Sequence, residues 1–146
     1  MDGQSYKLAT KCAKGVKMGA TALGHMSEYC EEGKIKGVME DYVAKHIELA
    51  EEIDCAIRAQ GRSPKDVGKI AEWFAVKGIE FKFAGKHDTS EVARSAVSGA
   101  DKAISMLERD ARMYSLAKPE ITDFVERTIE LERDFKKEMA EAEAKD

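Results

Sequence analysis

Apolar residues recur every three or four positions along almost the whole chain, which is the period of an α-helix with one buried face. Glycine and proline interrupt the pattern, and Gly61 and Pro64 stand where a helix commonly ends and begins. The pattern therefore predicts an all-α protein with helices at about residues 5–32, 36–60, 64–83, 89–115 and 119–143.

The first and fourth of these segments share residues at a constant offset, and so do the second and fifth. Gly15 falls on Gly99 at an offset of 84 (99 minus 15), and the run 41–43 falls on 123–125 at an offset of 82 (123 minus 41). We expect two similar helical hairpins that bury their apolar stripes against each other, because neither hairpin can bury its own. Segment 64–83 would be a long crossover between them, within a single domain of residues 1–146.

Three glycines lie on the apolar stripes of the first and fourth helices, at Gly15, Gly19 and Gly99. A glycine inside a helix costs about 1 kcal/mol relative to alanine. We therefore expect these glycines to let neighbouring helices approach closely. An alternative is that they line a cavity for a small ligand together with Ala103.

The pattern A-x-x-C-x-x-G-x-x-x-G at residues 9–19 is echoed as A-x-x-A-x-x-G-x-x-x-A at residues 93–103. With the two hairpins and the crossover, it resembles the ferritin-like superfamily, and within it a bacterial family of four-helix proteins of unknown function. The resemblance implies a ferritin-like four-helix bundle. Enzymes of this kind hold two metals with Glu and Glu-x-x-His from each half. Here Val43 stands three residues before His46, and Thr128 stands where His46 repeats, so the diiron site does not carry over.

His46 lies on the apolar stripe of segment 36–60 and is therefore expected to be buried. A buried imidazole without a partner would cost about 1–3 kcal/mol. Thr128, Ser105 and Thr21 are its candidate neutral partners, and Asp110 is a charged alternative. On one interpretation His46 and Thr128 are polar residues of the core, and on another His46 and Asp110 are the remnant of a metal site. No cofactor is predicted.

Segment 64–83 has more apolar side chains than one buried helix face requires. They are Ile70, Trp73, Phe74, Val76, Ile79, Phe81 and Phe83. They are either buried beneath the two hairpins or face a second subunit, because aromatic residues are enriched at protein interfaces. On the second alternative Trp73, Phe74 and Phe81 are the interface of a homodimer or another homo-oligomer.

Composition narrows the function only by exclusion. Hydrophobic residues make up 43% of the chain and charged residues 36%, and a net charge of −4 argues against a nucleic-acid partner. No apolar run reaches the length of a membrane span, and the first residues have no apolar signal segment, so we expect a cytoplasmic protein without a membrane partner. Three cysteines without a CxxC pair are expected to be buried free thiols.

These observations favour a non-enzymatic helical protein that acts through self-association or other protein contacts. The alternatives are a metal-binding protein or dimetal-type enzyme with a degenerate site around His46, and a binder of an unidentified small ligand.

Overall fold

The computed structural model describes residues 1–85 and 88–145, which fold into five α-helices with no strand in those ranges. The predicted all-α class is confirmed. The helices are α1 (Gly3–Ser27), α2 (Lys34–Ala59), α3 (Lys69–Phe83), α4 (Thr89–Met113) and α5 (Pro119–Lys145). None of the helices within the described ranges is long and apolar enough to cross a membrane.

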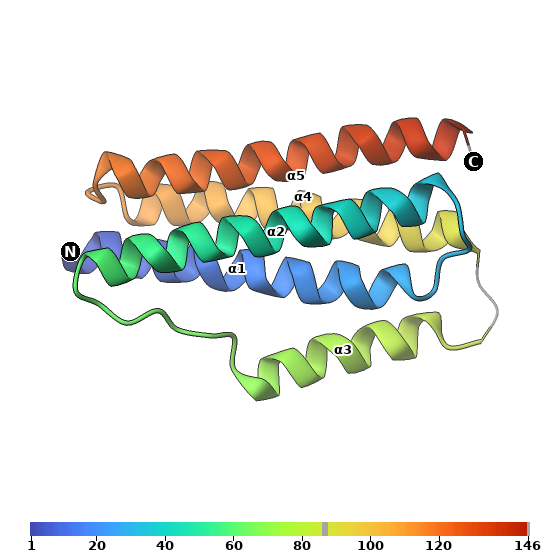
Figure 1. Ribbon diagram of the computed structural model, residues 1–146, viewed down its shortest axis with the longest axis horizontal. Helices are drawn as coiled ribbons and strands as arrows, with labels where there is room; N and C mark the ends of the chain where they lie inside the picture. The colour runs from blue at the N-terminus through green and yellow to red at the C-terminus, as the bar shows by residue number, and fades with distance from the viewer. Residues whose placement is uncertain (86–87, 146) are drawn as a thin grey trace.

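The four long helices α1, α2, α4 and α5 lie side by side along the long axis of the molecule, and α3 lies outside them (Figure 1). Helix α1 contacts α2, α4 and α5, and α5 also contacts α2 and α4. Helix α3 packs chiefly against α1 and returns the chain to the end where α2 began, so that α2 and α4 run in the same direction (Figure 1).

Helix α3 begins at Lys69, five residues later than predicted from Ser63 and Pro64. Side chains of α1 hold the preceding segment in an irregular conformation. The Tyr6 hydroxyl donates to the Ser63 carbonyl at 2.8 Å, and Lys17 Nζ donates to the Lys65 carbonyl at 3.2 Å. These carbonyls would be the first acceptors of a helix starting at Pro64, so their capture by α1 leaves the first part of the crossover without helical structure.

Helix α1 begins at Gly3 because Asp2 caps it, accepting from the Ser5 backbone N–H at 2.9 Å and from the Ser5 hydroxyl at 2.8 Å. The backbone hydrogen bond from Ser5 lowers the pKa of Asp2. The helix ends at Ser27, earlier than predicted, where the Ser27 hydroxyl donates to the Gly24 carbonyl at 2.8 Å. Cys30 is buried in the turn that follows, whereas Cys55 is exposed, so the expectation of buried thiols is wrong for Cys55.

The expectation that α3 is buried beneath the hairpins is wrong for most of its apolar side chains. Ile79 and Phe83 are buried at the end of α3, where Phe83 packs against Tyr29 with ring centroids 5.8 Å apart. Four large apolar residues of α3 are exposed: Ile70, Trp73, Phe74 and Phe81. The helix is therefore anchored through Ile79 and Phe83, and it exposes large apolar side chains from its first turn to its last.

The buried apolar side chains of the four long helices form two clusters. One includes Leu23, Met39 and Phe135, and the other includes Leu8 and Ile53. On α2 the first cluster ends at residue 42 and the second begins at residue 49, and on α5 the clusters are separated between residues 125 and 135. The layer between them contains the buried polar side chains that define the candidate site.

Candidate functional site

His46 is the buried polar residue of α2 in this middle layer, and only 1% of its surface is exposed. Its Nδ1 lies 2.6 Å from the Tyr42 carbonyl oxygen, one helical turn earlier. Its Nε2 lies 2.5 Å from Oε1 of Glu132, a buried residue of α5. The imidazole is therefore held at both nitrogens, and it joins the two hairpins through a side-chain contact.

The geometry fixes how many protons this pair holds. A carbonyl oxygen can only accept, so Nδ1 of His46 must donate and must bear a proton. One further proton is needed between Nε2 and the Glu132 carboxylate for the second hydrogen bond. Whether it resides on nitrogen or on oxygen, the His46–Glu132 pair has no net charge, which suits a buried position because an isolated buried charge is costly.

The hydrogen bonds of His46 go to Tyr42 and Glu132, and not to the predicted partners Thr128, Ser105 and Thr21. The Thr128 hydroxyl donates to the Phe124 carbonyl at 2.8 Å and lies 3.3 Å from Cys12 Sγ. Ser105 is exposed. Thr128 is a buried polar residue of the core, as predicted, but it does not satisfy the histidine.

Glu132 was missed because the apolar stripe of the last helix continues from Thr128 to Leu131, three residues on. The structure buries Glu132, four residues on from Thr128, and leaves Leu131 half-buried. Steps of three and four both keep a residue near the same helix face. The sequence offered one indication of Glu132. A buried His46 needs a hydrogen-bond partner, and an acidic residue at the same level of the bundle can provide it.

Burial also raises the pKa of the Cys12 thiol and of the Tyr42 phenol, which border this layer. Burial raises the pKa of Cys12 to about 11, so its thiol stays protonated at neutral pH. Burial and the hydrogen bond to Glu138 raise the pKa of Tyr42, whose hydroxyl donates to that carboxylate. Neither group is thereby activated as a nucleophile, because the thiolate is the reactive form of cysteine.

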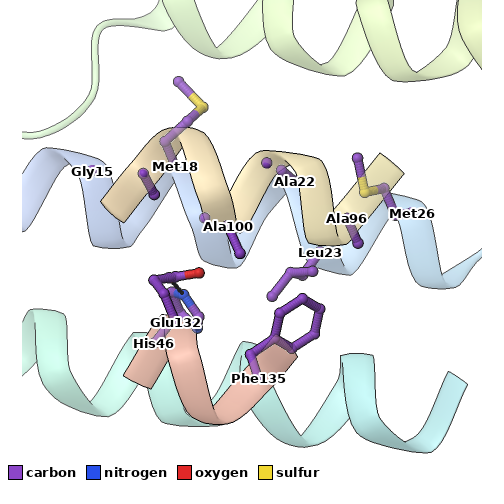
Figure 2. Close-up of a pocket in the computed structure, with 13 residues that line it drawn as sticks. Gly15, Met18, Ala22, Leu23, Met26, His46, Ala96, Ala100, Glu132 and Phe135 are labelled. Atoms are coloured by element: carbon purple, nitrogen blue, oxygen red, sulfur yellow. Dashed lines mark hydrogen bonds and ion pairs between the residues drawn. The ribbon is translucent and has the colours of Figure 1, made fainter. Parts of the chain in front are cut away.

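A pocket of about 210 Å³, here called the wide pocket, opens between the long helices at the His46–Glu132 pair (Figure 2). Its residues are Gly15, Met18, Gly19, Ala22, Leu23, Met26, His46, Ala96, Gly99, Ala100, Ala103, Glu132 and Phe135. In Figure 2 Met18 and Met26 point from α1 toward α3, while His46, Glu132 and Phe135 lie on the opposite side. The wide pocket thus has apolar walls and a hydrogen-bonded polar base.

The glycines of the predicted helix contacts turn out to have two different roles. A Cβ atom placed on Gly15 or Gly99 would meet no described atom within 4 Å, so the expected close approach of helices is wrong for these two. A Cβ atom on Gly19 would lie 2.9 Å from Cδ2 of His46, so only this glycine is required by close packing. Gly15 and Gly99 leave open space at the wide pocket.

A smaller pocket of about 60 Å³, here called the narrow pocket, continues from the wide pocket toward Asp110. Gly15, Ala103 and Glu132 line both pockets. Asp110 is buried, and its Oδ1 has no hydrogen-bond partner among the described residues. The structure therefore places Asp110 in the pocket next to that of His46 and not in contact with the imidazole.

Within the described ranges, no group of three or more His, Cys, Asp or Glu side chains is arranged to hold a metal ion. His46 Nε2 and Glu132 are two potential ligands, but they are already bonded to each other. Comparison with known proteins found no matching family, no matching curated protein and no matching solved structure.

The His46–Glu132 pair is expected to behave as a coupled unit in stability measurements. His46→Leu or Glu132→Met alone should destabilise the fold by about 3–5 kcal/mol, because each leaves a buried ionisable partner unpaired. The double variant should lose less than the sum of the two, measured by urea unfolding monitored by circular dichroism. Glu130→Met, at an exposed site on the same helix, should change stability by less than about 0.5 kcal/mol. Additive losses in the double variant would contradict a direct contact.

Proposed function

We propose that this protein binds a small, largely apolar molecule in the wide pocket. The single observation that supports this most strongly is an apolar pocket with a hydrogen-bonded pair without net charge, His46 and Glu132, at its base. Small-molecule sites in proteins are typically concave and mostly apolar, with a few polar groups that orient the ligand. They also occur between the helices of helical bundles.

The size of the wide pocket is consistent with a ligand of modest dimensions. An apolar cavity of about 150 Å³ is large enough to bind benzene, and the wide pocket has about 210 Å³. A molecule of roughly eight to ten non-hydrogen atoms would therefore fit. Met18 and Met26 add flexible, polarisable walls that can adapt to the ligand's shape.

Gly15 and Gly99 support the same proposal, because a glycine inside a helix lowers its stability relative to alanine. Gly15 and Gly99 could each gain a methyl group without a clash among the described residues. Alanine at a helix interior is favoured over glycine by about 1 kcal/mol. The two glycines keep open space between α1 and α4 and forgo the stability that alanine would add. Natural proteins commonly lose some stability at a functional site, so this choice is consistent with a ligand-binding pocket.

For the fold, we propose the ferritin-like arrangement of two repeated hairpins around a crossover. It is supported by the parallel course of α2 and α4, which a long connection makes possible (Figure 1). In such bundles, ligand and metal sites are built in the core from side chains on facing helices. His46 on α2 and Glu132 on α5 occupy a position of this kind.

The wide pocket should bind 1-hexanol as a neutral probe, with saturable heat in isothermal titration calorimetry. Gly99→Leu should abolish this heat because the new side chain fills the open space beside Gly99. Gly37→Leu is the matched control, since Gly37 is a helical glycine of α2 with equally open surroundings outside the wide pocket. Absence of binding in the original protein, or equal binding by the Gly99 variant, would contradict the proposal.

A second candidate function is self-association through α3, which one specific observation favours. Trp73, Phe74 and Phe81 are 55%, 65% and 88% exposed, and Ile70 is 75% exposed. Large apolar residues gathered on one short helix are typical of a contact surface. We propose that a second copy of this chain covers them, with the two α3 helices related by a twofold axis, the commonest symmetry of soluble oligomers.

Sedimentation velocity tests this second candidate. The original protein should form a dimer in a concentration-dependent manner, and Trp73→Ser with Phe81→Ser should shift it to a monomer because the buried apolar contact is lost. Glu72→Ser, at an exposed polar site on α3, should leave the dimer intact. A monomer at all concentrations in the original protein would contradict self-association.

A further inference from the structure

We infer that the ligand of the two pockets is an apolar amine, whose protonated head pairs with Asp110 in the narrow pocket while its body fills the wide pocket. This inference rests on the proposed function and specifies the chemistry of its ligand.

The carboxylate of Asp110 is the first reason. Asp110 is only 6% exposed, and its Oδ1 makes no hydrogen bond with any of the described residues. Buried polar groups are nearly always hydrogen-bonded, so an oxygen without a hydrogen bond, on a residue that lines the narrow pocket, requires an explanation. A carboxylate only accepts hydrogen bonds when ionised, and the missing partner must therefore be a donor.

One cationic side chain, Arg109, forms an ion pair with this oxygen but no hydrogen bond. Arg109 Nη2 approaches it to 3.8 Å, beyond hydrogen-bond distance, and the Arg109 side chain is 57% exposed. Lys11 also borders the narrow pocket but is an exposed residue. Solvent screens both charges, so a donor enclosed within the pocket would interact with Asp110 more strongly than either.

The two pockets are adjacent. Gly15, Ala103 and Glu132 line both, so the apolar space and the acidic end share a wall. On α4 the lining runs from Ala96 to Asp110, fourteen residues (110 minus 96), or about 21 Å at the helical rise. A ligand with an apolar body and a polar head at one end matches this division.

The carboxyl group of Asp110 is the feature of the narrow pocket that selects the head group of the ligand. Asp110 and Glu132 both border the narrow pocket, and the proton of the His46–Glu132 pair is already engaged in its own hydrogen bond. An ammonium group supplies several donors and a positive charge, and hydrogen bonds to ionised groups are about twice as strong as neutral ones. An alcohol can donate but gains no charge pairing, and a carboxylate ligand would be repelled.

Three probes with the same number of carbon atoms isolate the contribution of the head group: hexylamine, 1-hexanol and hexanoate, each titrated into the protein by calorimetry. We expect hexylamine to bind at least about tenfold more tightly than 1-hexanol, and hexanoate to bind more weakly than either. Asp110→Asn should remove the advantage of the amine, so that hexylamine and 1-hexanol bind with similar affinity. Asp110→Glu, which keeps the charge, should retain a preference for the amine, and unfolding curves check that each variant is folded.

The outcomes separate this inference from the proposed function. Equal affinities for hexylamine and 1-hexanol, or an amine preference that survives Asp110→Asn in a folded protein, would overturn the inference and leave the apolar pocket standing. Absence of binding by all three probes would overturn both. Tighter binding of hexylamine than of 1-hexanol, lost in Asp110→Asn and kept in Asp110→Glu, would support both the inference and the proposed function.

Discussion

The hydrogen bond between His46 and Glu132 is the interaction on which the rest of the structure depends. It links α2 to α5 between two apolar clusters, at a level where both helices would otherwise bury unpaired polar groups. The second bond of His46, to the Tyr42 carbonyl, sets the orientation of the ring and leaves the pair without net charge. A one-turn slip of α5 along α2 would separate the partners, so the pair also selects the register of the hairpins.

Small residues beside the same pair explain why the middle of the molecule is open. The ring of His46 lies against Gly19, where a Cβ atom would clash, and the neighbouring layer is lined by small residues of α1 and α4. Small side chains on facing helices leave a pocket unless the helices close together. Gly15 and Gly99 lie beside this space and not in a contact. A polar base, apolar walls and an acidic end at Asp110 are therefore consequences of one packing arrangement.

The hydrophobic period was sufficient to predict the helices and the burial of His46, because both depend on local spacing. The start of α3 was not predictable in this way, since it is decided by Tyr6 and Lys17, which are distant in sequence. Glu132 was missed because a step of three to Leu131 and a step of four to Glu132 fit the helix equally well. Whether Leu131 or Glu132 faces the core is determined only when the hairpins pack. The role of each glycine is determined in the same way.

Nitrogen NMR of the His46 side chain, assigned by comparison with His46→Gln, tests whether the buried pair exists. We expect a protonated Nδ1 whose hydrogen exchanges slowly with solvent, because it donates to the Tyr42 carbonyl inside the core. Glu132→Gln should alter the Nε2 signal and leave the Nδ1 proton in place. A bare Nδ1, or a ring whose protons exchange as rapidly as those of an exposed histidine, would contradict the buried pair.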